Sequence, residues 1–154
     1  MVEKYRNGVL VHGDASVDPC IGEVSSEVEK NAEATLQRFR NGMDNWKIND
    51  ALKAVWIFIR SLNKYIDVTM PWVLAKDEAK RAALDAVLYH LCEGMRFVSL
   101  MVEPVIPIAA EKIWAQLGLV DFEKANYENL VWGGIADGTK VAKGMPIFPR
   151  IEVE

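Results

Sequence analysis

The stretch LNKYIDVTMPWVLAKD (residues 62–77) joins two long amphipathic patterns, and it decides the fold that the sequence predicts. Proline disfavours helical geometry at the residue before it, so Pro71 predicts that the upstream helix ends at about Asp67. A second helix is expected downstream, because Asp77–Glu78 suit the positive N-terminal end of a helix. The chain therefore turns at Pro71 and places Trp72 at a junction between two helices.

Both patterns carry an apolar residue at alternating intervals of four and three, which places these side chains on one helix face. Two matched seams of this kind are typical of antiparallel helix bundles. Trp56 is expected to widen the first seam, and Trp46 and Trp114 are expected to fill the core with it. The first seam contains Ile48, Leu52, Val55, Ile59, Leu62 and Ile66, and the second contains Leu84, Leu88, Leu91, Met95, Val98 and Val102.

The N-terminal part of the chain is expected to hold two more helical segments and a loop. Residues 1–6 are typical of the last turns of a helix that is truncated at its N-terminus, closed by Asn7–Gly8. Residues 9–22 show no sustained period and predict a loop. The serines at 25–26 can cap a helix with one buried face, which is expected to stop at Asn41–Gly42.

The C-terminal part is expected to hold one short helix followed by irregular chain. The second seam closes at Glu103–Pro104, and Pro107 suits the first position of a helix that ends at Gly118. Residues 119–154 predict turns and an extended tail. The sequence therefore predicts one all-α domain over residues 1–154, an antiparallel bundle of four to five helices with an extended C-terminal tail.

Composition agrees with a globular domain of this size, since 51% of the 154 residues are hydrophobic and 26% are charged. No run approaches the roughly 20 apolar residues that span a bilayer, so no membrane association is expected. Two cysteines in unrelated contexts favour a reducing cytoplasm. The net charge of −4 argues against bulk electrostatic binding of nucleic acid, although residues 51–84 carry six basic and three acidic groups.

Recognisable catalytic chemistry is missing from the sequence. His12 and His90 have no neighbours at metal-ligand spacing, so the first is expected to be solvated and the second structural. Cys92 lies within a helical pattern without a charged partner, which favours a buried thiol. Phosphate-binding loops, nucleophile elbows and paired carboxylates in an apolar setting are also lacking. We therefore expect no catalytic site and no metal site in this chain.

Trp72 has two interpretations. As a packing residue, it would fill the gap between the ends of the two long helices, and composition alone favours this reading. As a recognition residue, its indole would be exposed at the end of the bundle, where an unpaired base could stack on it. Pro71 would then hold the ring in place, and Lys64 and Lys76 could contact phosphates.

The stretches NKYID (63–67) and PWVLAK (71–76) follow each other closely, preceded by MVEKYRNGV (1–9) and followed by KGMPIFPRI (143–151). In this order and spacing they resemble the anticodon-binding domain of methionyl-tRNA synthetases, and the resemblance covers nearly the whole chain. Other synthetases of the same class share the helical bundle but not the combination of the Pro-Trp motif with the Phe-Pro-Arg-Ile tail.

The resemblance implies that Trp72, beside Pro71, stacks on a base of the CAU anticodon. It also implies an asparagine and an arginine one turn apart in the first helix, at positions that would precede Met1. Lys4 lies about two helical turns beyond that arginine on the same face and is expected to add a basic contact. Lys64 is expected to contact a phosphate. Without the asparagine–arginine pair, weak and poorly discriminating binding is expected, because stacking tolerates any base.

The same resemblance implies a parent methionine–tRNA ligase that methionylates tRNA with ATP and Mg²⁺ in the cytoplasm. Its catalytic domain, with signatures of the HIGH and KMSKS type, is not in this sequence, so the chain alone is expected to bind no cofactor. The implied partners are the anticodon loop of tRNA(Met) and the catalytic domain of the parent enzyme. Asn63 and Tyr65 match the motif and are expected to be structural.

A competing hypothesis is a helical protein-interaction module that binds no RNA. In that case the seams and the tail would serve protein contacts, and Trp72 would have no part in RNA binding. A small metabolic enzyme has little support, because no acid, base or metal constellation occurs in the sequence.

Overall fold

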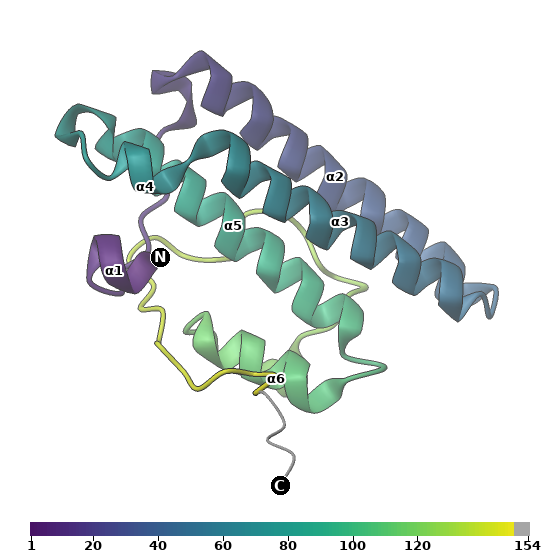
Figure 1. The fold of residues 1–154 in the computed structure, drawn as a ribbon. Helices are drawn as coiled ribbons and strands as arrows, with labels where there is room; N and C mark the ends of the chain where they lie inside the picture. The colour runs from purple at the N-terminus through teal and green to yellow at the C-terminus, as the bar shows by residue number, and fades with distance from the viewer. Residues whose placement is uncertain (150–154) are drawn as a thin grey trace, which may run out of the picture.

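Helices form almost all of the regular structure in the computed structural model, which describes residues 1–149. Figure 1 shows a long hairpin of two helices lying over a third, with shorter helices at the periphery. Within the described residues there is no strand beyond one isolated bridge between Val9 and Lys140. The all-α prediction is therefore confirmed. The α-helices are α1 Val2–Arg6, α2 Pro19–Asp44, α3 Ile48–Thr69, α4 Pro71–Leu74, α5 Arg81–Val102 and α6 Pro107–Gln116, with 3₁₀ turns η1 Ala15–Val17, η2 Glu78–Lys80 and η3 Phe122–Lys124.

Helix α2 begins earlier than the sequence analysis predicted. Pro19 occupies its first turn, and the Asp18 carboxylate caps it by accepting the Cys20 N–H at 3.1 Å. Proline is favoured at this position because its missing N–H would have no partner there. The prediction of a cap at the serines was wrong: the Ser25 hydroxyl is buried and lies 2.6 Å from the Tyr65 hydroxyl. The helix ends at Asp44, two residues beyond the predicted stop.

The buried face of α3 is shifted from the predicted seam. Ile48 at its start is exposed, whereas small residues of the neighbouring face are fully buried. The cause is the close approach of α2, since a Cβ added at Gly42 would lie 2.8 Å from the Cβ of Ala51. Small side chains face α2, and the larger residues of the predicted seam flank that contact. The buried residues of α3 are Ala51, Ala54, Val55, Phe58, Leu62, Tyr65 and Thr69.

The prediction that three tryptophans fill the core is confirmed for one of them. Trp114 is buried and donates its indole N–H to the carbonyl of Val120 at 3.0 Å. Trp46 lies in the turn between α2 and α3, where it is 87% exposed, and Trp56 is 50% exposed on the outer face of α3. Both were wrongly assigned to the core.

Helix α5 is the centre of the molecule, because α2, α3, α4 and α6 all contact it. The predicted seam of α5 is buried, except that Met95 is only partly buried. The helix ends at Val102, as the Glu103–Pro104 pair predicted, and α6 begins at Pro107 as expected. Asp77 accepts the Ala79 N–H at 3.0 Å and so caps the 3₁₀ turn that leads into α5.

The irregular segment from residue 119 onward is attached to α5 through buried charge. The Glu93 side chain is fully buried, pairs with Arg96, and accepts the Gly134 N–H at 2.8 Å. Arg96 also donates to the carbonyl of Val131. A Cβ at Gly134 would lie 2.5 Å from the Arg96 guanidinium carbon, so the backbone approaches this closely only as glycine. The expected extended tail therefore lies partly on the bundle.

A second ion pair attaches α1 to the beginning of α5. Arg6 donates to the Asp85 carboxylate at 2.7 Å, and both side chains are largely buried. Burial raises the pKa of the Asp85 carboxyl, an effect that the positive charge of Arg6 opposes. Asn7 closes α1 in the left-handed conformation, as the Asn-Gly pair predicted. Helix α1 thus lies against the end of α5 that follows α4.

Met70 forces the turn between α3 and α4. Its φ of 43° and ψ of 63° are left-handed, and its N–H closes α3 by donating to Ile66 at 2.9 Å. Helix α3 therefore runs to Thr69, two residues past the predicted end. A non-glycine residue in this conformation costs about 1–2 kcal/mol. The turn aims the short helix α4 away from the axis of α3.

We expect the loss of the Glu93 charge to destabilise the protein strongly. Glu93→Gln leaves the Arg96 guanidinium buried without its carboxylate, which should lower the free energy of unfolding by about 3–5 kcal/mol. The control Glu78→Gln removes an exposed ion pair with Arg81, which solvent screens, and should change the free energy of unfolding far less. Urea unfolding of both variants measures the difference. Equal losses for the two would contradict the central role of Glu93.

Glycine at position 70 should be more stabilising than alanine. Met70→Gly and Met70→Ala lose the same side-chain contacts beyond Cβ, but only glycine adopts the left-handed conformation without strain. We expect Met70→Gly to exceed Met70→Ala by about 1 kcal/mol in free energy of unfolding. Thermal and urea unfolding provide the comparison, and an alanine variant as stable as the glycine variant would show that the turn carries no strain.

Candidate nucleic-acid interface

Helix α4 presents Trp72 on the surface at one end of the bundle. Pro71 and Leu74 are buried against the core, whereas Trp72 and the next residue, Val73, face outward. One side of this single helical turn is buried and the other side is exposed. The burial of Pro71 and Leu74 therefore fixes the direction in which the side chains of Trp72 and Val73 point. The Trp72 side chain is 44% exposed, so it does not fill the core as the packing interpretation required.

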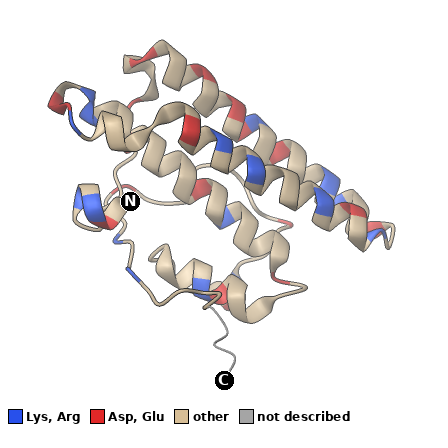
Figure 2. Cartoon of the chain, viewed as in Figure 1, with Lys and Arg blue, Asp and Glu red and all other residues tan. Residues whose placement is uncertain are grey.

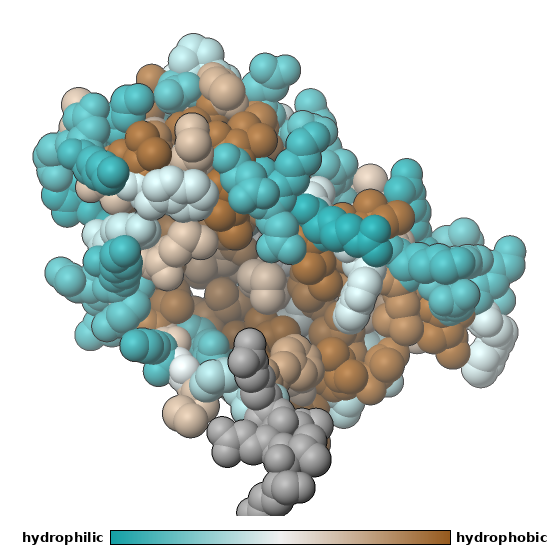
Figure 3. All heavy atoms as spheres, viewed as in Figure 1, coloured by the Kyte–Doolittle hydropathy of each residue, from teal (hydrophilic) through white to brown (hydrophobic). Residues whose placement is uncertain are grey.

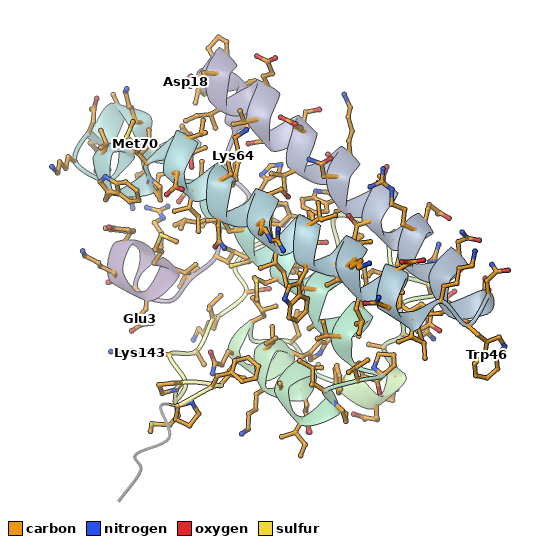
Figure 4. The ribbon with its side chains drawn as sticks, turned by 45° about the vertical axis from the view of Figure 1, so that its right-hand side comes forward. Glu3, Asp18, Trp46, Lys64, Met70 and Lys143 are labelled. Carbon is orange, nitrogen blue, oxygen red and sulfur yellow. The ribbon has the colours of Figure 1, made fainter. Side chains whose placement is uncertain are left out.

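Exposed apolar side chains surround the tryptophan along the chain. Val68 and Met70, at the end of α3, and Val73 are each about as exposed as Trp72. Figure 4 shows Met70 at the same end of the α2–α3 hairpin as Asp18, with Trp46 at the opposite end. A flat aromatic ring flanked by apolar groups is the kind of surface on which a base can stack.

The three lysines near this end have different surroundings. Lys76 follows α4 directly and is exposed. Lys64 is exposed on α3 but borders a shallow groove shared with Glu27 and Asn31 of α2. Lys4 is exposed on α1, where its ammonium lies 5.1 Å from the centre of the Tyr5 ring. The predicted site residues thus lie on three elements, α1, α3 and α4.

Charge at this end is mixed. Figure 2 shows acidic and basic residues interspersed along α2 and α3 and around α4. The exposed pair of Glu78 and Arg81 lies in the chain just after α4, and Arg81 has a raised pKa because the Glu78 carboxylate accepts its hydrogen bond. Any nucleic acid bound here would therefore depend on individual lysine contacts and on stacking.

The two motif residues beside Lys64 differ in role. Tyr65 is buried, as expected of a structural residue, and burial raises the pKa of its hydroxyl to about 12 although its bond to Ser25 acts in the opposite direction. Asn63 is exposed, which contradicts a packing role. The tyrosine therefore ties α3 to α2 through its hydroxyl.

The remaining reactive residues serve structure. His90 donates from Nδ1 to the Ala86 carbonyl at 2.7 Å, and burial lowers its pKa. His12 is exposed, as expected of a solvated residue, and in addition its Nε2 bonds the Ile135 carbonyl at 2.8 Å and its ring packs on Tyr89. Burial raises the pKa of the Cys92 thiol to about 12, as its helical context predicted, whereas Cys20 is exposed.

Residues 1–149 contain neither a candidate metal site nor a helix that could span a membrane. No three side chains of His, Cys, Asp or Glu approach one another closely enough to hold a metal ion in this part of the chain. No helix among the same residues is both long and apolar enough to cross a bilayer.

The sequence analysis did not predict the buried carboxylates of Asp85 and Glu93, because a charged residue gives no sequence signal of its own burial. Only the i, i+3 spacing of Glu93 and Arg96 indicates that these two side chains can pair.

Curated relatives match the chain along its whole length. It is 38% identical to the methionine–tRNA ligase of Caldanaerobacter subterraneus subsp. tengcongensis and 41% identical to methionine–tRNA ligase 1 of Bacillus cereus. In both cases all of this chain is covered but only 23% of the relative. The chain thus spans about a quarter of the length of these relatives.

A solved structure shows the same arrangement of helices. The free-state crystal structure of Mycobacterium tuberculosis methionyl-tRNA synthetase superposes with a TM-score of 0.86 at 29% identity, covering 100% of this chain and 30% of that one. The family model for the anticodon binding domain of methionyl tRNA ligase matches residues 18–154. The tail residues Arg150 and Ile151, which contributed to the resemblance, lie outside the described residues. The chain belongs to the family of anticodon-binding domains of methionyl-tRNA ligases.

Proposed function

We propose that this chain recognises the anticodon loop of tRNA(Met) as the non-catalytic part of a methionine–tRNA ligase. The observation that carries the proposal is the exposed Trp72, held on a turn whose other side, Pro71 and Leu74, is buried. A base stacked on the indole would gain about 1–3 kcal/mol. The rigid turn supports binding further, because little conformational freedom is lost when the ring is engaged.

Basic side chains near Trp72 would contact the phosphates. Lys4 and Lys64 are the proposed contacts from α1 and α3, and Lys76 is placed directly after α4. Glu27, which shares a groove with Lys64, should weaken the contribution of that lysine. The overall charge of −4 gives no general attraction for RNA, so we expect affinity to depend mainly on Trp72.

The remainder of the proposed ligase would supply the chemistry. That part would activate methionine with ATP and Mg²⁺ and transfer it to tRNA in the cytoplasm, in contact with the domain described here. The matched relatives, which are about four times longer than this chain, support the proposal. In this division of labour, residues 1–154 contribute binding and orientation of tRNA and take no part in bond making.

Substitution of Trp72 tests the proposal. Trp72→Ala should weaken binding of an anticodon stem-loop RNA carrying CAU by about 5- to 150-fold, the equivalent of losing one stacked base. Trp72→Phe should retain much of the affinity, because phenylalanine keeps an aromatic face. Trp46→Ala is the matched control, since it removes an exposed tryptophan from the opposite end of the hairpin.

Fluorescence anisotropy or calorimetry at fixed salt measures these affinities. Lys4→Ala and Lys64→Ala should each reduce the salt dependence of binding, by up to about 0.7 in the slope of log K against log salt. Identical affinity for the wild-type chain and Trp72→Ala would refute stacking at this site and favour a protein-interaction module instead.

A further inference from the structure

An apolar groove lies on the outer face of α3, away from Trp72. Trp56 and Ile57, in the middle of this helix, are 50% and 57% exposed. Val102, Val105 and Ile106, from the end of α5 and the connection to α6, form the opposite wall of a groove of about 430 Å³. Figure 3 shows apolar atoms gathered between the polar residues of α3 and helix α6.

The apolar surface continues beyond the groove. Val105 and Ile106 also line a second hollow of about 380 Å³, which Ile108 of α6 shares with Phe148 of the tail. Ile108 and Phe148 are 70% and 74% exposed. One surface thus extends from α3 over the α5–α6 connection to the last residues that the structure describes. Contiguous exposed apolar surface of this kind marks an interaction site in a soluble domain.

The chemistry of this surface suits a protein better than RNA. Six of the nine residues that line the groove are apolar, and Trp56 is its only aromatic residue. Branched aliphatic side chains pack well against other side chains, whereas bases prefer aromatic platforms joined to a charged groove. Lys53 and Arg60, together with Lys112 beside the second hollow, form a basic rim, so the partner should carry carboxylates around an apolar centre.

The length of the relatives indicates which protein covers the surface. Because the chain spans 23% of each of them, a ligase of that size would hold about three times as much polypeptide tethered to this domain. Tethering gives a weak interface a high effective concentration. Contacts between domains of one chain commonly bury about 600–1,500 Å² and mix apolar and polar groups.

We propose that the surface formed by Trp56, Ile57, Val105, Ile106 and Ile108 is the docking site for the rest of the same ligase polypeptide. The inference rests on the proposed function, since it takes the domain to be part of a full-length methionine–tRNA ligase. Residues 56 and 69 of α3 are separated by roughly 20 Å along the helix axis, from the rise of 1.5 Å per residue. Docking here leaves Trp72 free, so tRNA and the catalytic part can be bound at once.

Hydrogen exchange compares the full-length ligase that contains this sequence with the 154-residue chain. We expect peptides covering residues 49–60 and 102–108 to exchange at least ten-fold more slowly in the full-length protein, and the peptide over 70–76 to exchange equally in both. Ile57→Glu in the full-length protein should remove the added protection from 102–108. The matched control Val120→Glu, at another exposed aliphatic residue, should leave it intact.

Three results would overturn the proposal. The first is equal exchange in the two proteins, which would leave the surface to solvent. The second is protection in the 154-residue chain that rises with its concentration, which would assign the surface to a second copy. The third is protection of 49–60 in that chain by the CAU stem-loop, which would make it an RNA surface. The Trp72→Ala affinity is a separate readout, so failure of the docking site and failure of RNA recognition remain distinguishable.

Discussion

The buried carboxylate of Glu93 is the contact on which the arrangement of the molecule depends. Helix α5 buries its apolar faces against the neighbouring helices. Residues 119–149 contain little regular structure, so many of their backbone N–H and C=O groups need hydrogen-bond partners from elsewhere in the molecule. Glu93 meets this need by accepting the N–H groups of Gly134 and Ile135 while pairing with Arg96. Because an unpaired charge in the core is costly, the ion pair fixes one path for the tail over α5.

A second buried ion pair holds a neighbouring segment against the other end of α5. The pair of Arg6 and Asp85 holds α1 against the first turns of the helix. At this end the chain also has a left-handed residue, Met70, and an exposed indole, Trp72. Local strain and exposed apolar surface both reduce stability, and the protein retains them where the neighbouring elements are held by buried contacts. Such a combination is typical of binding sites.

Sequence reasoning succeeded where a single residue determines the backbone and was less reliable where packing decides. Pro71, Glu103–Pro104 and Pro107 marked ends and starts of helices to within two residues. The buried face of α3 was shifted from the predicted seam, of which Val55 and Leu62 are buried, because apolar residues cover more than half of that helix and the small Ala51 lies close to Gly42 of α2. The exposure of Trp72 followed from family resemblance, since composition alone favoured a packing role. Its role in stacking, like those of Lys4 and Lys64, stays a prediction.

The contrasting environments of the two cysteines have a practical consequence for chemistry on this domain. The Cys92 thiol is buried and held protonated by its surroundings, whereas Cys20 is exposed in the first turn of α2. A maleimide or similar reagent at neutral pH should therefore attach to one position in the native protein. That position adjoins Asp18, which Figure 4 places at the same end of the hairpin as Met70. A dye there would report on the neighbourhood of Trp72 without any engineered substitution.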